Sequence, residues 1–170
     1  HEQGANLTLA AEMFEADDQL IIDEYLAGKY DHKMFSDEVK LWKNYTTDYK
    51  PLLDFAKDNN LHFVASNIPR RYARMVYKLG IESLDSLDQE AKAYIAPLPF
   101  TIDLTLPGYK YMIESMGSHA PKGSIENMAK SQASKDATMA YFILEAAAKG
   151  NRVIHYNGAF HSNNFDGINY

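Results

Sequence analysis

Three short apolar runs, each followed by polar residues, constrain the fold more than any other feature of this sequence. The runs span residues 7–11, 61–65 and 152–156. Their length and their alternation with longer periodic stretches predict buried strands of a parallel sheet. Ligands bind such sheets outside the carboxyl ends of the strands. The polar residues that follow these runs therefore predict a functional site.

The stretches between the predicted strands have the periodicity of helices. We expect helices over residues 15–27, 36–45, 51–59, 69–79 and 124–149. Pro69 suits the first position of its helix, and Ser124 and Gly150 suit the two ends of the longest one.

Residues 81–123 do not fit this alternation. Pro97, Pro99 and Pro107 interrupt them, and the stretch is far longer than the usual connection of about 2–6 residues. The sequence therefore predicts an α/β fold with a mainly parallel sheet flanked by helices, formed by residues 1–80 and 124–170. Residues 81–123 form a small inserted helical subdomain or lid. We expect the sheet domain to be truncated at both ends, because residues 1–4 resemble the end of a helix and the chain stops at Tyr170 just after a loop.

Composition excludes several classes of function. The net charge is −6 with no basic block, which argues against a nucleic-acid partner. The absence of cysteine excludes disulfides, iron–sulfur clusters and thiolate zinc sites. No apolar run approaches the roughly 18 residues of a membrane span. No phosphate-binding loop, zinc-protease or α/β-hydrolase motif occurs.

Charged residues near the first two strands have two interpretations each. Glu12 is either a solvent-facing or helix-capping residue, or a ligand or general base at a strand end. Arg70 and Arg71 begin a helix, where the dipole disfavours cations. They either form structural ion pairs or bind an anionic group of a ligand.

The longest predicted helix carries two polar residues in an apolar stripe. Gln132 and Asp136 are four residues apart, in line with Met128 and Ala140. If the stripe is buried, both need partners, and they would orient an arginine or histidine of the site. If the helix is rotated, both face water.

Histidines and tyrosines supply two further candidates. His161 follows the last strand and Gly158, where it suits a ligand or an acid–base group, whereas His62 and His155 are typical of core histidines with satisfied ring nitrogens. Tyr109, Lys110, Tyr111 and His119 lie in the insertion and suit a flat hydrophobic ligand. Ordinary helix packing explains them equally well.

Taken in order, six segments resemble the ChaN-like family of bacterial haem-binding lipoproteins, which is related to the erythromycin esterase and Tiki protease group. The segments are Ala-Glu-Met-Phe at 11–14, Trp-Lys-Asn-Tyr at 42–45, Tyr-Lys-Pro at 49–51, and the stretches at 65–71, 132–140 and 158–161.

The resemblance implies an envelope lipoprotein that takes part in iron or haem uptake. It implies haem in a pocket of a homodimer, with a tyrosine as iron ligand and His and Lys residues near the propionates. Tyr109 is the first choice for the ligand and Tyr111 the second, and the further cofactor-binding candidates are Lys110, Lys122, His119, Arg70 and Arg71. It also implies anchoring to the outer membrane or in the periplasm by a lipid that lies outside this chain.

The wider group has a Glu/His site, hydrolytic in some members. Glu12 and His161 fit that site, but the family's first motif, Gly-Glu-x-His, is absent from the chain. A Glu/His-dependent hydrolase is therefore the alternative function. A non-catalytic haem binder is the leading one, and enzyme activity is left open.

Overall fold

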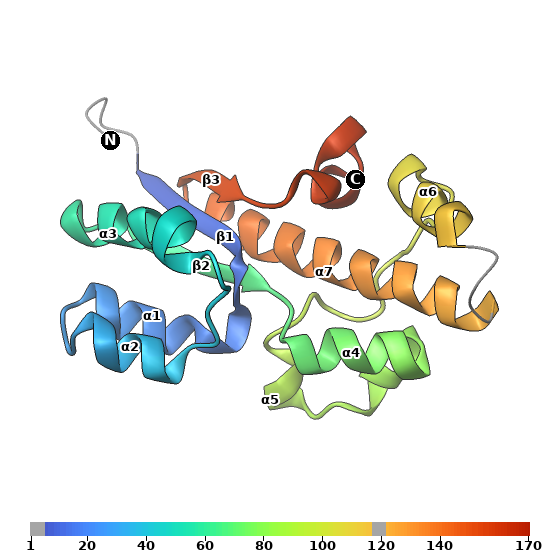
Figure 1. Ribbon diagram of the computed structural model, residues 1–170, viewed down its shortest axis with the longest axis horizontal. Helices are drawn as coiled ribbons and strands as arrows, with labels where there is room; N and C mark the ends of the chain where they lie inside the picture. Colours follow the sequence, from blue (N-terminus) through green and yellow to red (C-terminus); the bar gives the residue numbers. More distant parts are fainter. Residues whose placement is uncertain (1–5, 117–121) are drawn as a thin grey trace. The chain divides into compact units, whose positions relative to one another are not determined.

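The computed structural model describes residues 6–116 and 122–170 (Figure 1). Its strands are β1 (Leu7–Glu15), β2 (His62–Asn67) and β3 (Arg152–Tyr156). Its α-helices are α1 (Gln19–Leu26), α2 (His32–Glu38), α3 (Lys50–Asp58), α4 (Arg70–Leu79), α5 (Gln89–Lys92), α6 (Pro107–Met116) and α7 (Lys122–Ala148). Short turns of other helix types are η1 (Ala16–Asp18), η2 (Tyr45–Tyr49), η3 (Ile81–Ser86), η4 (Ala159–His161), η5 (Asn163–Phe165) and η6 (Gly167–Asn169). The predicted helix end at residues 1–4 lies outside the described residues.

The three strands form one parallel sheet in the order β2-β1-β3. One face packs against α1, α2 and α3 through a core that includes Phe14, Phe35 and Phe63. The other face contributes Ala10 and Val64 to a smaller cluster with the carboxyl-terminal part of α7. This arrangement confirms the predicted α/β fold with a parallel sheet flanked by helices.

The chain divides into two compact units. The first contains the residues up to Asn67 and the segment Phe142–Asn157, and so holds the sheet. The second contains Ile68–Tyr141 and Gly158–Tyr170. The predicted insertion at 81–123 falls within the second unit, together with α4, the first part of α7 and the carboxyl-terminal turns.

Two clusters of buried side chains form the core of the second unit. Ile68, Val76 and Leu84 belong to the cluster under α4 and η3, and Tyr109 and Ala129 belong to the cluster between α6 and α7. A buried hydrogen bond of 2.7 Å from Ser131 Oγ to the carbonyl of Ala73 joins α7 to α4. The unit therefore has a core of its own.

Several predicted boundaries are wrong for identifiable reasons. The helix predicted at 36–45 instead spans α2, because the Asp31 side chain accepts the Met34 backbone N–H and starts the helix earlier. The longest helix begins at Lys122 and not after Ser124. β1 extends to Glu15, so Glu12 lies within the strand and not beyond its end. His62 is exposed at the start of β2 and is not a core histidine.

Candidate functional site

A hydrogen-bonded trio of buried polar side chains lies in the second unit. The Tyr109 hydroxyl donates to Asp136 Oδ2 at 2.5 Å, and His161 Nδ1 lies 2.6 Å from Asp136 Oδ1. All three side chains are buried. Because an ionised carboxylate only accepts hydrogen bonds, His161 carries a hydrogen on Nδ1 and donates a hydrogen bond to Asp136. One carboxylate therefore joins α6, α7 and η4.

The sequence brings these three residues together through separate elements. Asp136 lies on the buried side of α7, near the fully buried Met139, in agreement with the first of the two interpretations of this stripe. Tyr109 lies in the first turn of α6, and His161 ends η4. Gln132, the other polar residue of the predicted stripe, is only half-buried.

Burial and charge keep Tyr109 protonated. Desolvation raises the pKa of Tyr109 far above its ordinary value, and the negative charge of Asp136 and its hydrogen bond raise it further. The carboxylate of Asp166 adds a smaller effect in the same direction. Tyr109 is therefore a neutral hydrogen-bond donor at physiological pH.

A second aspartate holds the same turn of α6. The Gly108 backbone N–H donates to Asp166 Oδ2 at 2.9 Å. Asp136 and Asp166 thus anchor two successive residues of α6, one through a side chain and the other through the backbone. A cavity of about 200 Å³ adjoins this anchor and is lined in part by Tyr109, Asp136 and Gly167.

The outer side of α6 is exposed. Tyr111 has 72% of its surface accessible, against 5% for Tyr109 two residues earlier. Lys110 is exposed and lies 3.9 Å from Glu114 on the same helix. The helix therefore fixes one tyrosine inside and presents another, next to a lysine, outside.

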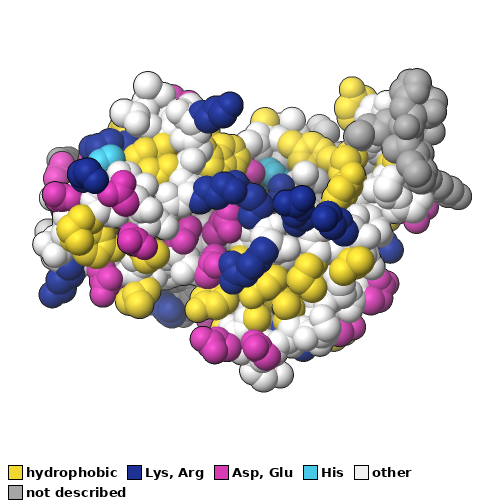
Figure 2. All heavy atoms as spheres, turned by 60° about the horizontal axis from the view of Figure 1, so that its bottom comes forward, with side chains coloured by type: hydrophobic (Ala, Val, Ile, Leu, Met, Phe, Trp, Pro, Cys, Tyr) yellow, Lys and Arg dark blue, Asp and Glu magenta, His cyan; other side chains and the backbone are white. Residues whose placement is uncertain are grey.

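The other predicted cofactor-binding residues are not part of α6. Arg70 and Arg71 are exposed in the first turn of α4, where Arg71 contacts the ring and hydroxyl of Tyr72. Figure 2 shows exposed lysine and arginine side chains on the face that it presents. Lys122 is the first residue of α7, and His119 lies outside the described residues.

The strand ends of the first unit carry a different polar network, which sequence reasoning missed. Ser66 Oγ lies 2.8 Å from His155 Nε2, and His155 Nδ1 lies 3.0 Å from Asn157 Oδ1. This order of groups is the one found in serine and cysteine hydrolases. However, Ser66 has no accessible surface, so its hydroxyl is not open to a substrate. The network instead satisfies both ring nitrogens of His155, as predicted, but His155 is half-buried and not in the core.

Glu12 is buried in β1, and its backbone carbonyl accepts a bond of 2.9 Å from Asn67. Glu12 belongs to the first unit and His161 to the second, so the two predicted catalytic residues stand in separate compact units.

Within the described part of the chain, no three His, Asp or Glu side chains gather in a way that could hold a metal ion. No described helix is both long and apolar enough to cross a membrane.

Comparison with known proteins identifies the protein family of this chain. The family model described as haem-binding uptake, Tiki superfamily, ChaN matches residues 1–170. The chain therefore belongs to the ChaN family of the Tiki superfamily, in agreement with the resemblance seen in the sequence.

A solved relative has the same fold. The structure of cofacial haem binding to ChaN of Campylobacter jejuni is similar, with a TM-score of 0.68 at 16% identity. The match covers 98% of this chain and 62% of that one, so the present chain spans under two thirds of its length.

A plant protein also matches. The chain is 30% identical over 97 residues to Protein RETICULATA-RELATED 5, chloroplastic, of Arabidopsis thaliana. That match covers 56% of this chain and 13% of the plant protein.

Proposed function

We propose that this chain binds haem at the exposed side of α6, where Tyr111 would ligate the iron. Membership of the haem-binding family supports the cofactor. The observation that carries the location is the 72% exposure of Tyr111 on a helix whose first turn two aspartates anchor. The anchor fixes the helix, and the exposed phenol remains free to bind.

Tyr111 is a better ligand than Tyr109 for an electrostatic reason. Ferric iron takes a tyrosine as phenolate, so ligation requires loss of the phenolic proton. For Tyr109 that loss would place a second negative charge against Asp136 in a buried site, which is why its pKa is raised. Tyr109 is the second choice, and its role in this proposal is to hold α6.

The residues of this face fit the chemistry of haem. Tyr111 supplies an oxygen donor, and its exposed ring offers a surface for the porphyrin. Lys110 supplies a cation for a propionate, since its contact with Glu114 is long and exposed. Bound haem would supply a ferric iron that accepts the phenolate oxygen.

A single exposed helix covers only one side of a porphyrin. We therefore propose that two copies of the chain close the site, each contributing its α6. The relative from Campylobacter jejuni, which binds haem cofacially, supports this arrangement. Gel filtration with light scattering, in the presence and absence of hemin, measures the stoichiometry, and a persistent monomer in saturating hemin contradicts the dimer.

Hemin titration followed by visible absorbance tests the site. We expect a shifted Soret band with wild-type protein and with Tyr109→Phe, and loss of the phenolate charge-transfer band with Tyr111→Phe. Tyr77→Phe is the matched control, because Tyr77 is exposed on another helix, α4. Loss of the band in Tyr109→Phe alone would show that Tyr109, and not Tyr111, ligates the iron.

A hydrolase is the second candidate, and one observation favours it. The hydrogen bond from His161 Nδ1 to Asp136 is the arrangement that orients a general base. Ester or peptide hydrolysis that is lost in both Asp136→Asn and His161→Gln would support it, whereas hemin binding without hydrolysis favours the first function.

We further propose that the protein serves iron or haem uptake at the bacterial cell envelope, as a lipoprotein whose anchor is attached outside these residues. Fractionation of cells that express the full-length protein tests the location. Growth with haem as the sole iron source, compared between wild type and Tyr111→Phe, tests the role in uptake.

A further inference from the structure

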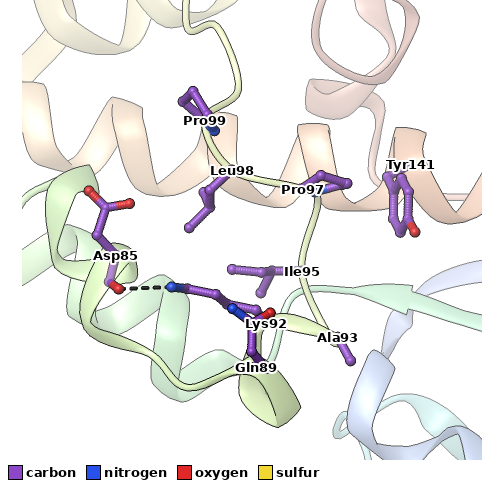
Figure 3. A pocket seen from close by; sticks show the side chains of 9 residues that line it. All are labelled: Asp85, Gln89, Lys92, Ala93, Ile95, Pro97, Leu98, Pro99 and Tyr141. Atoms are coloured by element: carbon purple, nitrogen blue, oxygen red, sulfur yellow. Dashed lines mark hydrogen bonds between the residues drawn. The ribbon is translucent and has the colours of Figure 1, made fainter.

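A cleft of about 600 Å³ lies in the second unit, apart from the α6 site (Figure 3). It is formed by η3, α5, the following extended segment and α7. Its lining residues are Asp85, Gln89, Lys92, Ala93, Ile95, Pro97, Leu98, Pro99 and Tyr141. Pockets of about 300–1,000 Å³ hold small-molecule ligands, so the size suits a ligand larger than one amino acid.

The cleft holds two opposite charges that do not neutralise each other. The Lys92 ammonium donates to the backbone carbonyl of Asp85 at 2.8 Å, which fixes its position and leaves two N–H donors (Figure 3). The Asp85 carboxylate is exposed, and within the described residues it forms no ion pair with Lys92. Each charge is therefore available to a ligand.

An apolar surface lies beside these charges. Leu98 is half-buried and lies between Asp85 and Tyr141 in the view of Figure 3, whereas Ile95 is buried and offers almost no accessible surface. Pro97 and Pro99 are exposed and also line the cleft. Proline has no backbone N–H, so this wall offers contact area with few hydrogen-bond donors.

We propose that this cleft binds a short apolar peptide with free ends. The peptide carboxylate pairs with Lys92 and its amino terminus pairs with Asp85. Its side chains pack on the accessible apolar surface of Leu98, Pro97 and Pro99. A peptide fits better than a free amino acid, because Lys92 and Asp85 are not held within ion-pairing distance and a peptide separates its two charges.

The same chemistry disfavours haem in this cleft. Haem carries two carboxylates, whereas the cleft offers one lysine and places a carboxylate at the same wall. This site is therefore independent of the proposed haem function, and either can fail without the other.

Calorimetry and thermal shift with Leu-Leu test the proposal, with N-acetyl-Leu-Leu and Leu-Leu-amide as probes that each lack one charge. We expect saturable binding of Leu-Leu and binding of each blocked peptide that is weaker by about tenfold or more. Asp85→Asn should remove the preference for a free amino terminus while leaving the preference for a free carboxylate.

Lys92→Met should remove the preference for a free carboxylate, and Lys92→Arg should keep it. Asp85→Asn retains the backbone carbonyl that Lys92 binds, so it separates ligand recognition from folding. Glu82→Gln, an exposed change on η3 outside the cleft, is the control. Absence of saturable binding at millimolar peptide, or equal affinity for free and blocked peptides, overturns the proposal whatever the same protein does with hemin.

Discussion

The Tyr109 hydroxyl lies 2.5 Å from Asp136 Oδ2, and the Asp136 carboxylate also accepts from His161. This contact decides the role of Tyr109. It makes Tyr109 a buried support of α6, whereas Tyr111 is exposed on the same helix.

Asp136→Ala should destabilise the protein by about 3–5 kcal/mol, because it leaves the Tyr109 hydroxyl and the His161 Nδ1–H without an acceptor in a buried site. The free energy of unfolding from urea denaturation measures the effect. Asp37→Ala is the control, since Asp37 forms an exposed pair with Lys33 and its loss should leave the urea midpoint unchanged. An unchanged midpoint for Asp136→Ala would mean that this aspartate is not the buried junction.

Tyr109→Phe keeps the ring and removes one hydrogen bond to a charged group. We expect a loss of about 1.5–3 kcal/mol in stability. The double variant Tyr109→Phe, His161→Phe tests whether the trio acts as a unit, because effects in one network are not additive. Additive losses would show that Asp136 serves the two partners independently.

Alkaline pH should destabilise the protein in part through Tyr109. Its pKa is raised in the folded state, so its stabilising contribution is complete below the unfolded pKa of about 10 and declines as pH rises above it. Each such tyrosine steepens the decline by about 1.4 kcal/mol per pH unit. Tyr109→Phe should therefore show a shallower loss of unfolding free energy between neutral and alkaline buffer than wild type, and an identical slope contradicts the buried, protonated state.

Gly167→Ala should disturb the packing of His161 and Asp136. Gly167 has φ +60°, and an added Cβ would lie 2.5 Å from the backbone oxygen of His161. Gly28 has φ +71° with nothing within 4 Å of its Cβ position, so Gly28→Ala carries the backbone strain alone, about 1–2 kcal/mol. The excess loss in Gly167→Ala, measured by thermal and urea unfolding, reports the clash, and equal losses argue against a close approach.

Local sequence patterns predicted the features that depend on residues close together in the chain. The parallel sheet followed from strands that alternate with helices, and the burial of Asp136 followed from its place in an apolar stripe of α7. The helix predicted from Ser36 is wrong because Asp31 caps and starts the helix earlier, so that Ser36 lies inside α2. Periodicity alone does not show which residue caps a helix.

The sequence predicted an arginine or histidine as a partner of a buried Asp136, and His161 confirms that type of residue. Which residues are the partners could not be predicted, because tertiary packing sets them. Tyr109 lies 27 residues before Asp136 and His161 lies 25 after it. Tertiary packing also sets the two hydrogen bonds of the Gln19 side chain to β2. Gln19 donates to the carbonyl of Phe63 and accepts from the N–H of Ala65, each at 2.8 Å. Tyr109 and Tyr111 both lie on α6, and only the packing shows which of the two is buried.

The most direct test of the account is the visible spectrum of the Tyr111→Phe variant in saturating hemin, beside wild type and Tyr109→Phe. We predict that wild type and Tyr109→Phe show the phenolate-to-iron charge-transfer band and that Tyr111→Phe lacks it while retaining its fold by circular dichroism. A Tyr111→Phe spectrum identical to that of wild type would contradict haem ligation at the exposed side of α6.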